Sequence, residues 1–89
     1  MAIGIRLKLA GVTQEQFDAM DAAIGKGPFE GLIFHASGPV EGGWGVLDFW
    51  DSRGHFDAFI AEHVMPAMAG SSGPMPDIHE FPVHEYLKP

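Results

Sequence analysis

Two residues of the kind that perform acid–base chemistry fall in neighbouring predicted strands. His35 lies in residues 32–37 and Asp48 in residues 44–50, and a glycine-rich turn joins the two runs. Alternation gives the two side chains the same phase, so the carboxylate could orient the imidazole as a general base. Such a pair could deprotonate a phenol or an acidic C–H group. Trp44 and Trp50 share this phase and could form a flat apolar wall for a ring.

A structural role for the same residues is also open. Arg6, on the first predicted strand, could form an ion pair with Asp48 that only stabilises the sheet. Ser37 or a backbone carbonyl could satisfy the imidazole of His35. The structural role is the better prediction for Arg6 and Asp48, whereas both roles stay open for His35.

His63 is the second candidate for acid–base chemistry. It lies near the apolar stripe of a predicted helix, where a histidine close to Pro66 is more often a partner for a freed carbonyl than a catalyst. Tyr86, near the end of the chain, is a candidate ligand contact, although packing and edge hydrogen bonds are the better prediction for it. No spacing of histidines or acids resembles a metal motif, so we expect no metal site.

The composition excludes several classes of partner. Twelve acidic residues against five basic ones give a net charge of −7, which disfavours nucleic acid and anionic membranes. No cysteine is present, and the N-terminal apolar run is interrupted by Arg6 and Lys8, unlike a signal peptide or a membrane span. We expect a single domain over residues 1–89 that is cytoplasmic and gains stability from self-association.

The first half of the chain predicts a strand, a helix and a loop. Residues 2–9 alternate between apolar and small or charged side chains, as in a half-buried strand. Thr13 and Gln16 form a capping-box pattern that begins a helix, and Gly25 is placed to end it. Residues 25–31, rich in glycine, form a loop.

The second half predicts a hairpin and a second helix. Residues 32–37 and 44–50 are its strands, and the turn between them spans residues 38–43. Asp51 or Ser52 caps the helix that follows.

The end of this helix and the last strand are both affected by proline. Pro66 should kink or stop the helix, and residues 69–76 form a linker. Residues 78–87 predict a strand, which Pro82 confines to an edge or to a crossing between subunits.

The predicted order β-α-β-β-α-β is that of a ferredoxin-like sandwich of the α+β class, with two helices over one face of a four-stranded antiparallel sheet. The helices are expected to bury Ile3, Ile5, Leu7, Leu32, Phe34, Leu47 and Phe49. The opposite face would carry Arg6, Ile33, His35, Ser37, Trp44, Val46, Asp48 and Trp50. Such an apolar face needs a cover, and a second copy packed face to face would close a barrel between two subunits.

The run VLDFWDSRGHFDAFI resembles the strand-to-helix signature of the dimeric α/β-barrel superfamily, which includes antibiotic-biosynthesis monooxygenase-like proteins. The matching residues are Val46, Trp50, Asp51, Ser52, Phe56 and Phe59. The GPVEGGW turn and the FPVHEYL end resemble small members whose chemistry is uncharacterised. Haem-degrading members use an Asn and a Trp that this chain lacks, since it has no asparagine and carries Phe59 in the Trp position.

The resemblance implies a homodimer with a pocket for a hydrophobic or aromatic small molecule, between sheet and helices or inside the barrel. It implies an enzyme of the cofactor-free monooxygenase, cyclase or isomerase type, acting on an aromatic or polyketide-like substrate. The alternative is a non-catalytic dimeric ligand-binding or accessory protein. The candidate site has His35, Asp48 and His63 as catalytic residues and Arg6, Ile33, Ser37, Trp44, Trp50, Phe59 and Tyr86 as ligand-binding residues.

Overall fold

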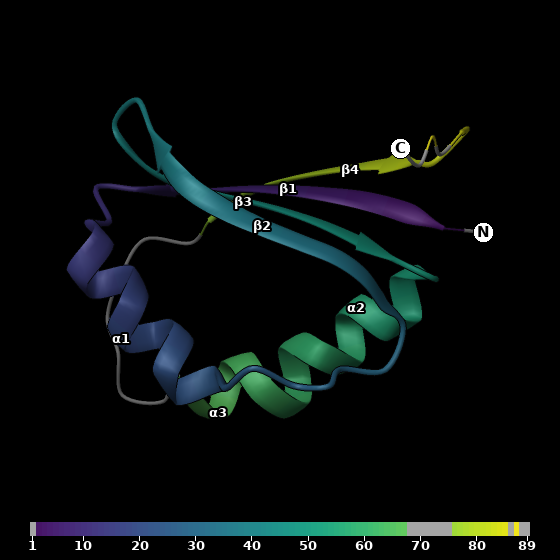
Figure 1. Cartoon of the computed structure of the whole chain (residues 1–89), viewed down its shortest axis with the longest axis horizontal. Helices are drawn as coiled ribbons and strands as arrows, with labels where there is room; N and C mark the ends of the chain where they lie inside the picture. The colour runs from purple at the N-terminus through teal and green to yellow at the C-terminus, as the bar shows by residue number, and fades with distance from the viewer. Residues whose placement is uncertain (1, 68–75, 86, 88–89) are drawn as a thin grey trace.

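Four strands form one antiparallel sheet, and the helices lie on one of its faces (Figure 1). The structure, a computed structural model, describes residues 2–67, 76–85 and 87. The strand order is β2-β3-β1-β4, so the predicted ferredoxin-like architecture is confirmed. The elements are β1 (Ile3–Ala10), α1 (Gln14–Ile24), β2 (Leu32–Val40), β3 (Gly43–Trp50), α2 (Arg53–Phe59), the π-helix η1 (Ile60–Val64), α3 (Met65–Ala67) and β4 (Asp77–Pro82).

Side-chain caps begin both long helical segments. The Thr13 hydroxyl accepts a hydrogen bond from the Gln16 backbone N–H at 3.2 Å, and the Thr13 N–H donates to the Gln16 side chain at 2.9 Å. This reciprocal pair is the predicted capping box, and it satisfies two backbone donors that the helix leaves free. Ser52, rather than Asp51, caps α2 through its bond from the His55 N–H. Gly25 follows α1 with a φ of 90°, in the region that favours glycine.

The hairpin between β2 and β3 is tighter than predicted. Pairing continues to Val40 opposite Gly43, so only Glu41 and Gly42 form the turn. Gly42 has a φ of 79°, a backbone conformation that favours glycine, and the ladder on either side of the turn extends further than the alternation indicated.

The second helical segment does not stop at Pro66. Residues Ile60–Val64 form a π-helix, and the Met65 N–H donates to the Ile60 carbonyl five residues earlier. A proline cannot fit the regular α-helical ladder, because it lacks an N–H and its ring crowds the carbonyl four residues before it. The widened turn before Pro66 lets the helical path continue into α3.

The sheet faces differ from the prediction for β2 and β3. Ile5 pairs with Asp48 and Asp48 pairs with His35, and residues directly opposite in an antiparallel ladder project to the same face. Since Ile5 is fully buried under the helices, Asp48 and His35 also face the helices. The helix side of β3 carries Trp44, Val46, Asp48 and Trp50, and its open side carries Leu47 and Phe49.

Two features explain this reversal. The β2 ladder shifts its register between Leu32 and Phe34, so a bulge at Ile33 moves Phe34 to the open face while Leu32 stays on the helix side. On β3 the expectation placed the charged Asp48 away from the core. The structure buries that carboxylate to 4% exposure instead, because His35 on the next strand pairs with it.

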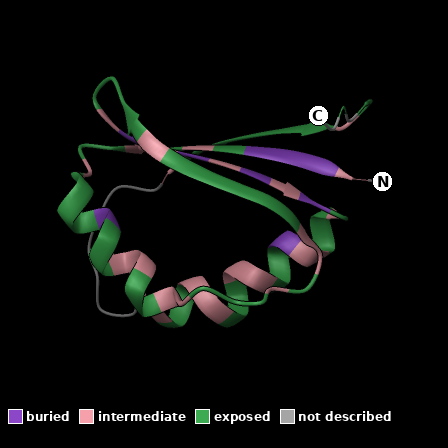
Figure 2. Ribbon diagram, in the orientation of Figure 1, coloured by how far each residue is buried: buried purple, intermediate pink, exposed green. Residues whose placement is uncertain are grey.

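The core consists of two hydrophobic clusters on the helix side of the sheet. The first joins Ile3, Ile5, Trp50 and Phe56, and the second joins Phe17, Trp44 and Val46. Figure 2 shows the first residues of β1 and every second residue of β3 as buried, whereas most of β2 and all of β4 are exposed. The central strands therefore hold the core, and the two edge strands depend on them.

The last strand is shorter than predicted. β4 spans Asp77–Pro82 rather than 78–87, and it lies at an edge beside β1, where Pro82 needs no donor on its free side. Most of the predicted linker 69–76 lies outside the described residues. Within the described ranges, no helix is both long and apolar enough to cross a membrane.

The adjacent residues Val46 and Leu47 test the assignment of the two faces. Val46→Asn places an unpaired amide in the second core cluster, so we expect the free energy of unfolding to fall by about 3 kcal/mol or more. Leu47→Asn alters the open face and should cost well under half of that for the isolated chain. Urea denaturation at low protein concentration measures both. A larger loss for Leu47→Asn would restore the face assignment predicted from the sequence.

Candidate functional site

The centre of the candidate site is a hydrogen bond between the two predicted catalytic residues. His35 Nδ1 lies 2.5 Å from Asp48 Oδ1, across the β2–β3 ladder. The two side chains differ sharply in accessibility, since the carboxylate of Asp48 is 5% exposed and the imidazole of His35 is 41% exposed. A buried carboxylate thus holds one ring nitrogen of an accessible imidazole.

The carboxylate also shifts the titration of the imidazole. The hydrogen bond from His35 to Asp48 raises the histidine pKa above 6.5, although partial burial works in the opposite direction. The negative charges of Asp48 and Asp21 raise the pKa of His35 further, and the nearby Lys26 lowers it. A basic imidazole is therefore present on the helix side of the sheet.

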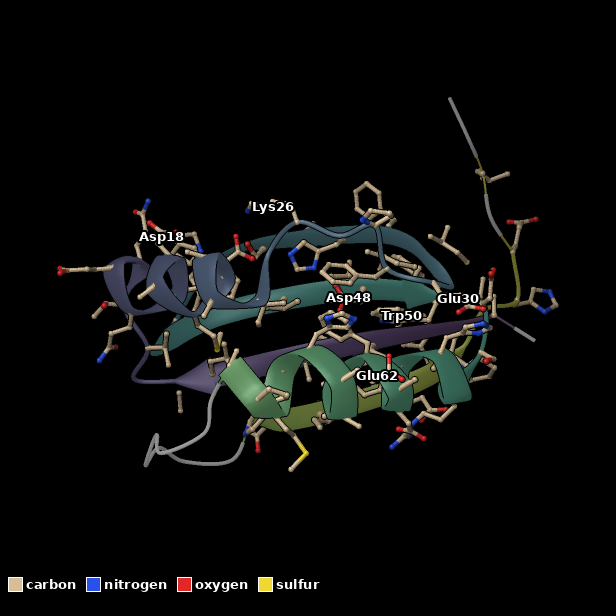
Figure 3. All side chains as sticks on the ribbon, turned by 90° about the horizontal axis from the view of Figure 1, so that it is seen from below. Asp18, Lys26, Glu30, Asp48, Trp50 and Glu62 are labelled. Atoms are coloured by element: carbon tan, nitrogen blue, oxygen red, sulfur yellow. The ribbon has the colours of Figure 1, made fainter. Side chains whose placement is uncertain are left out.

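Asp21 and Lys26 are residues of the site that the sequence did not reveal. They form an ion pair at the end of α1 and the start of the following loop, where both act on the charge of His35. Figure 3 shows Lys26 on the same side of the sheet as Asp48, with Asp48 lying between the α1 and α2 segments rather than beneath either one. Only the topology places the end of the first helix beside the second strand, so no local pattern could have identified this pair.

The two tryptophans flank the dyad on the helix side, but they belong to different clusters. Trp44 stacks on Phe17 with ring centroids 5.5 Å apart. Trp50 contacts Phe59 with a centroid distance of 5.1 Å and Phe56 at 6.0 Å. The predicted wall is therefore divided, and both rings contribute to the core. The indole N–H groups of both tryptophans are buried and have no hydrogen-bond partner within the described residues.

His63 belongs to an aromatic group beside the dyad. Its ring lies 5.0 Å from Phe29 and 5.8 Å from Phe59, measured between ring centroids. Phe29 also meets Phe59 edge to face at 4.8 Å. Phe59 therefore contacts both Trp50 and His63, as a residue that lines a ligand site would. The contacts of His63 are mainly with aromatic rings. Phe29 was missed because it lies in the irregular loop before β2.

The remaining predicted ligand residues do not lie together. Arg6 pairs in register with Leu47 and His79, which puts it on the open face, so the predicted ion pair with Asp48 is wrong. Ser37 pairs with Val46 on the helix side, two residues from His35 on β2, and is not the partner of that histidine. Ile33 lies in the bulge, and Tyr86 falls outside the described residues.

Metal-ligating residues do not converge in the described part of the chain, where no three His, Asp or Glu side chains could hold one ion. The surface of the described residues includes two hollows that bear on the site. One of about 90 Å³ lies between the loop and the second helical segment, lined partly by Phe29, Phe59 and His63. The other, of about 540 Å³, lies on the open sheet face. Neither is lined by His35 or Asp48, so the exposed imidazole itself is the point of access to the dyad.

No family model and no curated protein sequence matches this chain. Solved structures do match over nearly their whole length. A protein from Chloroflexus aurantiacus J-10-fl, named provisionally as an antibiotic biosynthesis monooxygenase, is 21% identical with a TM-score of 0.65, covering 97% of each chain. MhuD with manganese protoporphyrin IX is 19% identical with a TM-score of 0.67, covering 100% of each.

A third similar structure is SnoaB from Streptomyces nogalater, described as a cofactor-independent oxygenase. It is 15% identical with a TM-score of 0.60, and the match covers 97% of this chain and 94% of SnoaB. The chain has their fold. The resemblance predicted from the strand-to-helix run is therefore confirmed at the level of the fold, and identities this low carry no statement about chemistry.

The titration of His35 tests the geometry of the dyad. We expect NMR to show a pKa above 6.5 in the wild-type protein, and Asp48→Asn to lower it, because the main cause of the increase is removed while burial remains. Asp51→Asn, at an exposed carboxylate, is the matched control and should leave the His35 titration unchanged.

The same shift predicts how stability depends on pH. Because folding raises the His35 pKa, the stabilisation is fully present below pH 6.5 and is lost as the pH rises through the raised value. Asp48→Asn should abolish this dependence in urea denaturation between about pH 5 and 9. If the wild-type protein and Asp48→Asn respond alike to pH, His35 and Asp48 are not coupled in solution.

Proposed function

We propose that this protein is an enzyme that removes a proton from an aromatic or polyketide-like small molecule, with His35 as the general base and Asp48 as its positioning residue. The observation that carries this proposal is the 2.5 Å contact between a buried carboxylate and an accessible imidazole. A packing interaction alone does not need one of its two members to stay open to solvent.

The chemistry follows from the roles of the two ring nitrogens. With Asp48 accepting from Nδ1–H, the lone pair of the neutral ring lies on Nε2, which can accept a proton from a bound phenol or acidic C–H. The substrate becomes a phenolate or carbanion, and His35 becomes an imidazolium that Asp48 stabilises. The substrate then determines whether oxygenation, cyclisation or isomerisation follows.

The surroundings of the dyad favour a flat apolar substrate. Phe29, Phe59 and His63 form connected ring contacts that end on Trp50 beside Asp48. The unpaired indole N–H of Trp50 can donate to a substrate oxygen if the cluster opens on binding, which would remove the cost of a buried unsatisfied donor. SnoaB, described as a cofactor-independent oxygenase, shares the fold and supports this class of reaction.

We also propose that the chain is a homodimer associated through the open sheet face. The exposed side chains there include Phe34 at 55% and Phe81 at 42% exposure. Together with Phe49, these rings make an apolar area that is unusual for a free surface.

A non-catalytic ligand-binding protein is the second candidate. Trp44 and Trp50 are largely buried against Phe17, Phe56 and Phe59, so both rings serve the core as well as any ligand. A protein that only binds would use these surfaces without needing the basicity of His35.

Deuterium exchange at an acidic C–H group tests the proposed proton transfer without knowledge of the natural reaction. With 2-tetralone or anthrone as the probe in D2O, we expect His35→Gln to lower the enzyme-dependent exchange rate by about 10²–10⁴-fold. Asp48→Asn should lower the rate and shift its pH profile downward, as the pKa of His35 falls.

His84→Gln is the matched control, because His84 is exposed and lies after β4, outside the paired strands of the sheet. Unchanged exchange after joint replacement of His35 and Asp48 would refute the assignment of the base. Binding of the probe, seen by tryptophan fluorescence, without any exchange in the wild-type protein would favour the ligand-binding alternative.

A further inference from the structure

One basic side chain lies close to the dyad, and the proton transfer described above does not use it. Among the described residues, Lys26 is the base whose positive charge opposes the charging of His35, so its ammonium acts at the imidazole across a short distance. The side chain of Lys26 is 83% exposed, and it forms an ion pair with Asp21. This ammonium is therefore accessible from solvent at the place where a substrate would meet His35.

The backbone around Lys26 brings it back to the end of α1. Gly25 ends the helix with a φ of 90°, and its N–H donates to the carbonyl of Asp21 at 2.9 Å. Gly27 follows Lys26 with a φ of 84°, so the chain turns sharply on both sides of the lysine. The ammonium can thus reach the carboxylate of Asp21, which lies five residues earlier in the chain.

The other described bases are held away from the dyad. Arg6 and Lys8 pair in register with Leu47 and Gly45, which puts both on the open face of the sheet. Arg53 lies on the helix side, where two carboxylates hold it. The chain carries a net charge of −7, so most of its surface repels an anion. Within the described residues, only Lys26 is placed to attract an anion to the dyad.

The proposed reaction creates an anion at this point. Asp48 and Asp21 both raise the pKa of His35 and so favour the imidazolium, but the same two charges repel a substrate that has lost its proton. A phenolate or an enolate carries its charge on oxygen. A donor already placed at that oxygen would stabilise the transition state in which the charge develops.

We propose that Lys26 changes partner during the reaction, from the carboxylate of Asp21 in the free protein to the oxygen of the deprotonated substrate. This inference rests on the proposed function and adds a second catalytic residue to it. The O–H or C–H bond of the substrate breaks, an N–H bond forms at Nε2 of His35, and the electron pair stays on the substrate. The ammonium of Lys26 donates a hydrogen bond to the oxygen that carries the charge.

The exchange needs little rearrangement. Ion pairs at exposed positions are weak because water screens them, so Asp21 holds Lys26 in place without preventing its release. Once Lys26 has left, the charge of Asp21 is no longer balanced, and it acts with Asp48 on the new imidazolium. Asp21 is thus a positioning residue, and both products of the proton transfer gain an opposite charge.

The arrangement restricts the class of substrate. An ammonium suits an oxygen acid, either a phenol or a ketone that forms an enolate, and disfavours a substrate that carries a positive charge. Figure 3 shows Lys26 and Trp50 on opposite sides of Asp48. A substrate with an oxygen on each side of its acidic position would therefore contact both the ammonium and the indole N–H.

Binding of a stable anion tests the role of Lys26 without any reaction. The probes are 4-nitrophenolate and its uncharged analogue nitrobenzene, and quenching of tryptophan fluorescence measures the dissociation constant of each. We expect the wild-type protein to prefer 4-nitrophenolate. Lys26→Gln should weaken binding of 4-nitrophenolate by about 5-fold and leave nitrobenzene unchanged, because only the charged contact is lost.

Two further variants separate the charge of Lys26 from the packing around it. Lys26→Arg should restore the preference for 4-nitrophenolate. Asp21→Asn removes the competing carboxylate and should tighten binding of 4-nitrophenolate, which is the opposite of the effect of Lys26→Gln. Arg53→Gln is the matched control, since it removes the same charge from another ion pair of the helix side and should change neither dissociation constant.

Deuterium exchange of anthrone connects this contact to the proton transfer. Lys26→Gln should lower the enzyme-dependent rate by about 10-fold when the rates are compared above the pKa of His35. The same variant should raise the pKa of His35 measured by NMR, because a positive charge is removed and Asp21 loses its partner. A residue that only supported the fold would not combine a slower reaction with a more basic imidazole.

The results separate this inference from the function on which it rests. Equal loss of affinity for both probes in Lys26→Gln, or no loss for either, overturns the role of Lys26. A wild-type protein that does not prefer 4-nitrophenolate to nitrobenzene overturns it as well. A preference that depends on Lys26, in a wild-type protein that exchanges no deuterium, supports the anion contact and contradicts the proton transfer by His35.

Discussion

The burial of one carboxylate constrains most of this structure. Asp48 lies in a central strand at 4% exposure, where an unpaired charge would be prohibitively unfavourable, and His35 on the neighbouring strand supplies the bond that makes this position tolerable. The pair fixes the phase of both strands, because a slip of one residue would expel Asp48 and bury Leu47 instead. The same interaction that makes the carboxylate acceptable in the core therefore decides which residues meet the helices. It also leaves an imidazole with one nitrogen occupied and the other free, which is the requirement for a general base.

The helix layer is divided at this same point. One cluster joins Phe17 of α1 to Trp44, and the other joins Phe56 of α2 to Trp50. Asp48 lies between the two helical segments (Figure 3). On β3 the polar Asp48 lies between Val46 of one cluster and Trp50 of the other, while Leu7 of β1 packs against both clusters. The aromatic residues near Phe59 lie on the Trp50 side of the dyad. The π-helix at Ile60–Val64 comes directly after α2 and contains His63. Its wider turn determines the direction in which the His63 side chain leaves the helix.

Local chemistry made parts of this arrangement predictable from the sequence, and long-range pairing made other parts unpredictable. The capping box of Thr13 and the cap of Ser52 were found because each depends on residues within three positions. The order of elements and the partnership of His35 with Asp48 also followed from alternation. The faces of β2 and β3 did not, because a bulge at Ile33 leaves no mark in the sequence and because burial of an acid is unexpected until its partner is known. Because Asp48 was expected on the open face, Arg6 was predicted to lie beside it. The register places the two residues on opposite faces of the sheet.

The two faces of β3 connect the proposed chemistry to the proposed assembly. Asp48 faces the helices while its neighbours Leu47 and Phe49 face the second copy, so successive residues of one strand serve different surfaces. His35 lies on β2, an edge strand that is mostly exposed and pairs only with β3 within the chain. An edge strand held on one side is a weak support for a catalytic base, which needs its position fixed to within a fraction of an ångström. In the proposed homodimer, the second copy covers the open face of the sheet, which includes the exposed Phe34 of β2. Association would then stabilise the strand that carries the base, which gives the open face a part in the chemistry although none of its residues touches the substrate.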